Sequence, residues 1–287
     1  MNLENYIDNQ KILINKKIEN YLESLNIDNE ILNLGMHYSI LNGGKRIRPI
    51  LCLAAAECFN GNLDNAMSAA LAVEFFHCST LVHDDLPSMD NDNIRRGKPT
   101  CHIKFGEANA ILLGDALLIE SFRILSSNNQ IKHIEELANS AGANGVIAGQ
   151  VADLLFENKK PSAKIVKYIH YNKTAILIRA ALRMGALTAD TEVKYLKKLS
   201  IYGEKIGLAF QIQDDILDEV SSSDKIGKTA KSDLKKSKMT YPFVYGIEKS
   251  KKIIKKLTLD ANQELEKIPL DTKILEKISL YLLSRSN

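Results

Sequence analysis

Residues 69–90 read AALAVEFFHCSTLVHDDLPSMD, an apolar stretch that ends in Asp84, Asp85 and Asp90. Apolar residues fall on most faces of the helix that this stretch predicts, so we expect a helix buried at the centre of the fold. Carboxylates gathered at the end of such a helix repel one another unless a cation lies between them. The stretch therefore predicts a core helix with a cation site at its carboxyl end.

A second stretch with the same layout lies far along the chain, where residues 206–218 read IGLAFQIQDDILD. Asp214 and Asp218 are four residues apart, so on a helix they share one face and can hold one ion. Mg²⁺ takes oxygen ligands, keeps several waters and often shares its shell with substrate phosphates. Two facing aspartate clusters therefore indicate a phosphate or diphosphate held by Mg²⁺.

Simpler explanations exist for each cluster on its own. A solvated acidic helix end is common, but Phe210 and Ile212, beside the second cluster, have the character of core residues. A calcium loop of the EF-hand type over residues 84–95 needs glycine at its sixth position and glutamate at its twelfth, where this chain has Met89 and Arg95. With both clusters counted together, metal binding is the better interpretation.

Basic residues lie near both clusters. Residues 43–49 read GGKRIRP, and residues 95–99, RRGKP, follow the first cluster closely. Lys173, Lys228 and Lys238 lie further along the chain. An acidic site flanked by arginine and lysine suits a substrate with several negative charges, because Mg²⁺ can bridge the aspartates to one phosphate while the basic side chains hold another.

The composition argues against a nucleic-acid-binding protein and against a membrane-inserted one. The net charge is only +3, with 25% charged residues, so nothing indicates a nucleic-acid partner. The first residues lack the pattern of a secretory signal, and no apolar run approaches the ~18 residues of a membrane span, so we expect no stable membrane insertion. The four cysteines lack metal-ligand spacing. We therefore expect buried, reduced thiols and a cytoplasmic location.

Helical periodicity runs through most of the chain, and no segment alternates with the period of a strand. The exception is residues 86–106, a polar stretch with two prolines and two glycines that we expect to be a loop. No linker or internal repeat divides the chain, so we expect one all-α domain over residues 1–287. The helices expected beyond this loop cover residues 107–127, 131–157, 162–186, 190–220, 240–257 and 260–284.

Taken together, these motifs resemble the trans-isoprenyl diphosphate synthases, and most closely the bacterial farnesyl and geranylgeranyl diphosphate synthases. The resemblance implies a single-domain bundle of long helices around a deep central cavity, the isoprenoid synthase type, and a homodimer. The matching stretches occur in the order of the family and are residues 43–49, 76–118, 149–153, 173–174, 210–218 and 238–242.

The resemblance also implies a metal centre and two substrates. Three Mg²⁺ ions, for which Mn²⁺ can substitute, hold the diphosphate of an allylic substrate. Four residues separate Asp85 from Asp90, which is the commoner bacterial form of the first motif. Asp215 is expected to contact the metal-binding residues rather than the metal itself. The implied metal ligands are Asp84, Asp85, Asp90, Asp214 and Asp218.

The second substrate implied by the resemblance is isopentenyl diphosphate, bound without metal by Lys45, Arg48, His77 and Arg96. The implied direct ligands of the allylic diphosphate are Arg95, Lys173, Lys228 and Lys238. Oxygens of Lys173, Thr174 and Gln211 would stabilise the allylic carbocation that forms when the carbon–oxygen bond breaks. Gln150 and Asp153 are expected to support these residues from a neighbouring helix.

Product length depends on the floor of the cavity. Ser79 lies five residues before Asp84, and Thr80 lies four residues before it. Bacterial farnesyl synthases usually have an aromatic residue at that fifth position, so Ser79 leaves space and favours a C20 product over C15. Residues 101–118, in contrast, are most similar to farnesyl synthases, whose product is C15. A product longer than C20 is a further alternative.

Two other functions compete with this one. A terpene cyclase also ionises a prenyl diphosphate with aspartates and Mg²⁺, but it needs no second diphosphate site such as residues 43–49 provide. A non-catalytic subunit of a prenyl synthase tends to lose its aspartates, whereas this chain keeps all five principal ones. We therefore expect a short-chain prenyltransferase.

Overall fold

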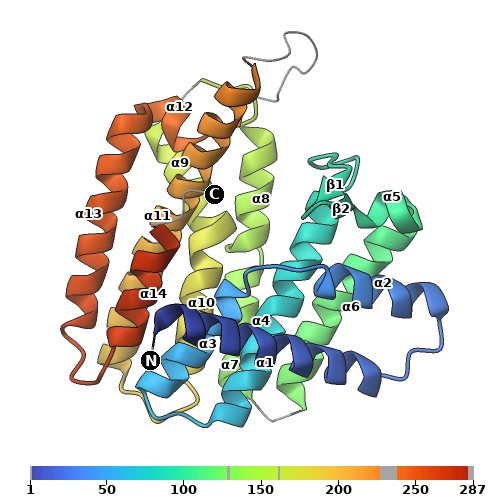
Figure 1. Ribbon diagram of the computed structural model, residues 1–287, viewed down its shortest axis with the longest axis horizontal. Helices are drawn as coiled ribbons and strands as arrows, with labels where there is room; N and C mark the ends of the chain where they lie inside the picture. Colours follow the sequence, from blue (N-terminus) through green and yellow to red (C-terminus); the bar gives the residue numbers. More distant parts are fainter. Residues whose placement is uncertain (1, 128–129, 161, 227–237, 284–287) are drawn as a thin grey trace. The chain divides into compact units, whose positions relative to one another are not determined.

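The computed structural model describes residues 2–127, 130–160, 162–226 and 238–283 (Figure 1). The regular secondary structure of these residues is helical apart from two strands of two residues each, which confirms the all-α prediction. Within the described residues, no helix is both long enough and apolar enough to cross a bilayer.

Contacts along the chain define two compact units. The first consists of residues 1–135 and 184–190, and the second of residues 136–183 and 191–287. The chain passes between the units at three points, one inside helix α7 (Ile131–Ala141), one inside helix α10 (Ile176–Ala186) and one after residue 190. The organisation of residues 1–287 as a single domain stays a prediction.

The first unit is organised around α4 (Leu63–Asp84), the helix predicted from residues 69–90. Phe75 and Phe76 on α4 are 0% and 2% exposed, so the prediction of a core helix is confirmed. Helix α4 packs against α3 and α6. The other helices of this unit are α1 (Leu3–Ser24), α2 (Glu30–Leu41), α3 (Ile47–Cys58), α5 (Cys101–Phe105), α6 (Glu107–Ser126) and the start of α7 (Ile131–Ala141).

The loop expected over residues 86–106 contains regular structure. Strands β1 (Ile94–Arg95) and β2 (Lys98–Pro99) form an antiparallel hairpin, with Arg95 opposite Lys98, and α5 follows. The turn residues Arg96 and Gly97 both have positive φ, 53° and 76°, as a two-residue hairpin turn requires. Strands this short carry no alternation of apolar and polar residues, so the sequence pattern could not predict them.

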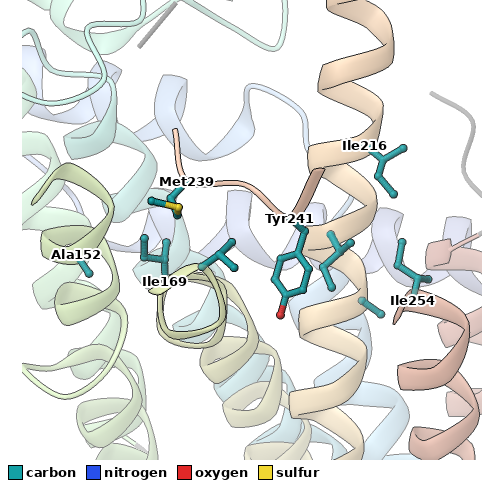
Figure 2. Close-up of a cluster of buried hydrophobic side chains, with 9 residues drawn as sticks. Ala152, Ile169, Ile216, Met239, Tyr241 and Ile254 are labelled. Atoms are coloured by element: carbon teal, nitrogen blue, oxygen red, sulfur yellow. The ribbon is translucent and has the colours of Figure 1, made fainter. Parts of the chain in front are cut away.

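The second unit is organised around the long helix α11 (Val193–Ile226), which packs against α13 and the π-helical turn η1. Figure 2 shows part of its apolar core, where Ile169, Ile216 and Tyr241 come from three different elements. The other elements are α8 (Val146–Leu155), α9 (Ala163–His170), η1 (Tyr171–Ala175), α10, α12 (Tyr241–Tyr245), α13 (Ile247–Leu265), α14 (Lys273–Leu283) and the rest of α7.

Several predicted helix boundaries were wrong. The helix expected over 131–157 is broken between α7 and α8, because the chain turns so tightly that a Cβ on Gly145 would lie 2.0 Å from the carbonyl oxygen of Ser140. Near the carboxyl end, Gly246 at φ 78° separates α12 from α13, and α13 continues without a break through residues 258–259. That helix ends instead just before the segment that contains Pro269, which has no backbone N–H to continue it.

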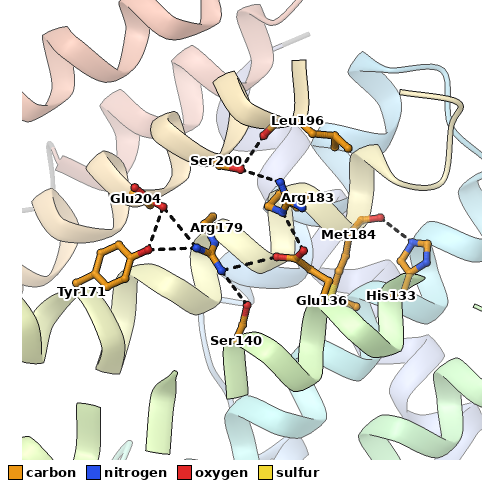
Figure 3. Close-up of polar contacts among 10 residues, drawn as sticks. All are labelled: His133, Glu136, Ser140, Tyr171, Arg179, Arg183, Met184, Leu196, Ser200 and Glu204. Atoms are coloured by element: carbon orange, nitrogen blue, oxygen red, sulfur yellow. Dashed lines mark hydrogen bonds and ion pairs between the residues drawn. The ribbon is translucent and has the colours of Figure 1, made fainter. Parts of the chain in front are cut away.

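A polar network ties four elements of the second unit together (Figure 3). Arg183 on α10 lies 2.9 Å from Glu136 on α7 and donates to Ser200 on α11 at 2.9 Å. Arg179, one turn earlier, donates to the hydroxyl of Tyr171 in η1 at 3.1 Å. Because each arginine bonds to two elements, the network fixes how α10 packs beside α11 and η1.

Candidate active site

The first aspartate cluster forms where α4 ends. The backbone N–H of Asp90 donates to the carbonyl oxygen of Asp84 at 2.8 Å, so the chain folds back on itself and places these two aspartates together. Both are half-buried. Their carboxylate oxygens are the donors that a hard divalent cation prefers. The residues present therefore fit the metal that the sequence predicts at this position.

Asp85 is bound by Arg95 in this structure. Its side chain is 4% exposed, and the guanidinium of Arg95 contacts both carboxylate oxygens, with Nη2 to Oδ1 at 2.5 Å and Nε to Oδ2 at 2.8 Å. Burial raises the pKa of the Asp85 carboxyl, and the hydrogen bonds from Arg95 oppose that shift. A residue predicted to bind metal and a residue predicted to bind diphosphate are thus partners of each other, and both roles stay predictions.

A cationic cluster surrounds His77 in the same unit. Arg48 Nη1 lies 3.2 Å from His77 Nε2. Arg96 donates to the carbonyl oxygen of Gly43 and lies against Gly44, where a Cβ would meet its guanidinium at 2.8 Å. Burial, and next the charges of Arg48 and Arg96, hold the pKa of His77 well below its ordinary value. A neutral imidazole among guanidinium groups suits an anionic ligand.

The structure thus brings together three of the four residues predicted to bind isopentenyl diphosphate, namely Arg48, His77 and Arg96. Lys45, the fourth, is exposed on the segment between Gly44 and α3. Only glycine adopts the backbone of Gly43 and Gly44 easily, because their φ angles are +84° and +124°. The two glycines therefore permit the close approach of Arg96.

Arg46 differs from its basic neighbours, and sequence reasoning missed its role. Its side chain is 1% exposed and forms an ion pair of 2.5 Å with Glu74 on α4. It also donates to the carbonyl oxygen of Ile40 at 2.5 Å and to Asn15 at 2.9 Å. The signal was present, because a glutamate inside an apolar core helix needs a buried cationic partner.

The π-helical turn η1 carries Lys173 and Thr174 in the second unit. Two glycines let neighbouring helices approach it, since a Cβ on Gly149 of α8 would lie 2.3 Å from Lys173 N, and one on Gly207 of α11 would lie 2.5 Å from the Cα of Ala175. The sequence predicted an uninterrupted helix over 162–186, and the extra residue of a π turn leaves no periodic signal. Such turns are frequent at functional sites.

The predicted residues of the second unit interact directly. Lys173 Nζ lies 2.7 Å from Asp153 Oδ2, and Lys238 Nζ lies 3.9 Å from the same oxygen. Thr174 Oγ1 donates to Gln211 Oε1 at 2.8 Å. The structure therefore brings together the three residues predicted to stabilise a carbocation, while Lys228 lies outside the described residues.

The second aspartate cluster lies on α11. Asp214 is half-buried and Asp218 is exposed one turn later, whereas Asp215 between them is buried. Mg²⁺ at phosphate-transfer sites usually takes one or two carboxylates and completes its shell with water and phosphate oxygens. Asp214 and Asp218 have the donor type and exposure for that. No three acidic, histidine or cysteine side chains in the described part of the chain already form a metal cage.

Ser79 and Thr80, predicted to control chain length, bond to their own helix. Ser79 Oγ donates to the carbonyl oxygen of Phe76 at 2.7 Å, and Thr80 Oγ1 donates to that of His77 at 2.8 Å. Ser79 is 2% exposed and Thr80 is half-buried. Their role in chain length stays a prediction.

Comparison with known proteins identifies the family. The family model for polyprenyl synthetase matches residues 29–275. The chain belongs to the polyprenyl synthetase family. This confirms the resemblance seen in the sequence motifs. Members of this family use a divalent metal.

Several relatives of this polyprenyl synthetase are similar over almost its whole length. The farnesyl diphosphate synthase of Escherichia coli is 42% identical, covering 95% of each chain. A chloroplastic geranylgeranyl pyrophosphate synthase of Capsicum annuum is 42% identical, covering 92% of this chain and 73% of the relative. The solved geranyltransferase of Helicobacter pylori, complexed with magnesium and isoprenyl diphosphate, has a TM-score of 0.80 at 32% identity, covering 97% of this chain and 96% of its own.

Proposed function

We propose that this polyprenyl synthetase condenses an allylic diphosphate (dimethylallyl, geranyl or farnesyl) head to tail with isopentenyl diphosphate, giving geranylgeranyl or farnesyl diphosphate and free diphosphate. The observation that carries the proposal is the cationic cluster around His77. It lies in the same unit as the first aspartate cluster and provides a second place for a diphosphate. A cyclase acting on one prenyl diphosphate does not need such a place.

The predicted metal ligands would hold three Mg²⁺ ions, replaceable by Mn²⁺, which supply Lewis-acid stabilisation of the leaving diphosphate. Arg95, Lys173, Lys228 and Lys238 neutralise the same group. Hydroxyl, amide and backbone oxygens of Thr174, Gln211 and Lys173 stabilise the allylic cation in a dry site. The double bond of isopentenyl diphosphate attacks that cation, and the released diphosphate accepts the proton, since no side chain stands out as a base.

Product analysis tests this function directly. Dimethylallyl, geranyl and farnesyl diphosphates are each supplied with Mg²⁺, with and without isopentenyl diphosphate, and the products are separated by chromatography. Elongated products and released diphosphate are expected only when isopentenyl diphosphate is present. Release of diphosphate from the allylic substrate alone, with a cyclic product, would favour a cyclase. No turnover under any of these conditions would favour a non-catalytic subunit.

Replacing Arg48 with alanine is expected to weaken binding of isopentenyl diphosphate selectively. A lost charge-assisted bond to a phosphate is worth roughly 1.5–3 kcal/mol, so the KM for isopentenyl diphosphate should rise about ten- to a hundredfold. Steady-state kinetics with each substrate varied in turn measures this. Arg123→Ala, at an exposed arginine on α6, is the control and should change neither KM. A larger rise in the KM for the allylic substrate would mean that the two sites are reversed.

Replacing Ser79 with tyrosine is expected to shorten the dominant product from C20 towards C15 or C10. The Cα of Ser79 lies roughly 7.5 Å along the helix axis from that of Asp84, so a tail extending from the metal site should pass near it. Overfilling a packed site costs ~1–3 kcal/mol, enough to stop another elongation step. Chromatography of the products measures the change, with Ser126→Tyr on the exposed end of α6 as control. An unchanged product spectrum would show that Ser79 does not form the floor of the product cavity.

A homodimer is also part of the proposal. Ile111, Leu112 and Ile119 on one side of α6 are 47%, 59% and 64% exposed, an apolar stripe that a second copy could cover. Light scattering after size exclusion should give a mass about twice the 32.0 kDa of one chain. A mass equal to one chain at micromolar concentration would contradict it. We also propose a cytoplasmic location, with which the four buried cysteines agree, since none of them forms a disulfide.

A further inference from the structure

His170 is a buried histidine that neither the sequence motifs nor the proposed function uses. It is the last residue of α9, immediately before the π turn, and its side chain is 5% exposed. Its Nε2 lies 3.2 Å from Asp215 Oδ2 on α11, and its ring stacks on Tyr241 with centroids 5.1 Å apart. Nδ1 is buried and has no hydrogen-bond partner in the described part of the chain.

The protonation of His170 follows from this environment. Burial lowers the pKa of His170 to about 3, so the ring is neutral. Both Asp215 oxygens act as acceptors, from the N–H of Tyr241 and from Gln211 Nε2, so the single ring proton is assigned to Nε2, the nitrogen that faces Asp215. His170 therefore has one polar function, which is to donate to Asp215.

Asp215 connects His170 to the predicted catalytic residues through hydrogen bonds. Besides His170, its carboxylate accepts from Gln211 Nε2 at 3.1 Å. Because the amide nitrogen of Gln211 is held in this way, its carbonyl oxygen faces Thr174, whose hydroxyl donates to it at 2.8 Å. The orientation of Gln211 and Thr174 thus depends on where the Asp215 carboxylate lies.

Asp215 also holds the backbone that carries Lys238. The N–H of Tyr241 donates to Asp215 Oδ2 at 3.0 Å, the same oxygen that His170 contacts. Lys238, three residues earlier, lies 3.9 Å from Asp153, which also binds Lys173. Figure 2 shows Tyr241 among the residues of the apolar core to which Ile216 of α11 also belongs.

We propose that His170 is a positioning residue for the half of the site that ionises the allylic substrate. Its Nε2–H holds the Asp215 carboxylate in the one place from which it can bond both Gln211 and the backbone of Tyr241. The inference rests on the proposed roles of Thr174, Gln211 and Lys173. It assigns Asp215 to hydrogen bonding within the protein rather than to metal binding.

Two substitutions separate the hydrogen bond from the ring. His170→Phe keeps an aromatic ring for Tyr241 and removes the donor, whereas His170→Gln keeps a donor near the position of Nε2 and removes the ring. His170→Phe should lower kcat about ten- to a hundredfold, the usual effect of losing a group that orients a functional side chain. The KM for isopentenyl diphosphate should stay within about twofold, and His170→Gln should keep kcat within about threefold.

His133→Phe is the matched control. His133 is equally buried, 5% exposed, and its Nε2 bonds a backbone carbonyl oxygen, that of Met184, at 2.8 Å. If His170 only supported the fold, both phenylalanine variants would lower the melting temperature, and kcat per folded molecule would stay unchanged in both. Equal kcat values for His170→Phe and the unaltered protein would overturn the proposal, as would a loss of kcat in His170→Gln equal to that in His170→Phe.

Two further variants keep the test decisive. If His170→Phe does not fold, His170→Asn replaces it, because asparagine is polar but too short to place a donor at Nε2. Equal kcat in His170→Asn and His170→Gln would then overturn the proposal. Thr174→Val tests the underlying function separately. Unchanged kcat in Thr174→Val would show that the assumed role of Thr174 is wrong, whereas loss there without loss in His170→Phe would show that only the inference about His170 is wrong.

Discussion

Replacing Asp84 with alanine should reduce turnover about a hundred- to a thousandfold while leaving the helical content unchanged. Asp84 is half-buried at the end of the core helix, and the backbone of Asp90 folds back onto it, so its carboxylate has a defined place in the proposed metal site. Loss of one metal contact removes several kcal/mol of stabilisation from the departing diphosphate, and ~1.4 kcal/mol corresponds to tenfold in rate. The measurement is kcat at saturating substrates, with circular dichroism on the same samples.

The metal itself can be removed in the same experiment. Chelation should abolish turnover of the unaltered protein, and added Mg²⁺ should restore it. Asp214→Ala should resemble Asp84→Ala, because the resemblance implies that both aspartates bind Mg²⁺ ions needed for the same ionisation step. Asp64→Ala, at an exposed aspartate in the first turn of the same helix as Asp84, is the control and should keep full activity. Near-normal turnover in either Asp84→Ala or Asp214→Ala would rule out that aspartate as an essential metal ligand.

Glu74→Gln should lower the free energy of unfolding by about 3–5 kcal/mol, the cost of leaving a buried charge without its counterion. Arg46 and Glu74 are 1% and 3% exposed, and their charged atoms lie 2.5 Å apart. Arg46 also has φ 52°, an uncommon backbone region for a residue other than glycine, so its position is held by these side-chain contacts. Urea unfolding followed by circular dichroism measures the loss as a lower midpoint at unchanged slope.

Two variants show whether charge or packing causes this loss. Lys45→Ala, next to Arg46 but exposed, should change the free energy of unfolding by no more than about 0.5 kcal/mol. The double variant Arg46→Met with Glu74→Leu should recover most of the stability, because well-packed apolar residues often replace a buried ion pair without loss. A midpoint for Glu74→Gln equal to that of the unaltered protein would show that the buried pair contributes nothing.

Much of the helical fold could be predicted because apolar periodicity is a local property. Residues 69–84 are apolar on most faces, and α4 is accordingly the core helix of the first unit. The boundaries that failed depend on single residues in special backbone conformations, such as Gly145 and Gly246. Apolar periodicity is averaged over several helical turns, so a single residue in a special backbone conformation does not change it. The hairpin at Ile94–Pro99 was missed for a related reason, since its strands are too short to alternate.

Site residues were predicted best where charge concentrates in the sequence. The aspartate clusters and the basic runs can be recognised directly in the sequence. The structure brings Arg48 and Arg96 of those runs together around His77. Sequence reasoning could not tell which basic residue of a run points inward, so Arg46 was left out, although Glu74 gave a clue. His170 gave no signal at all, because a lone histidine in an apolar helix is usually an ordinary core residue.

The π turn at Tyr171–Ala175 has a consequence for how this chain tolerates insertions and deletions. Each residue of an α-helix advances the side chains by about 100°, so one additional residue rotates everything that follows it by that angle. Deleting any residue of the turn would allow a regular helix, yet it would swing Arg179 and Arg183 away from Glu136. The same deletion would shift Lys173 relative to Asp153. Length is therefore constrained here more strictly than residue identity, and length variation among related chains should be rarer across this turn than in the segment between α7 and α8.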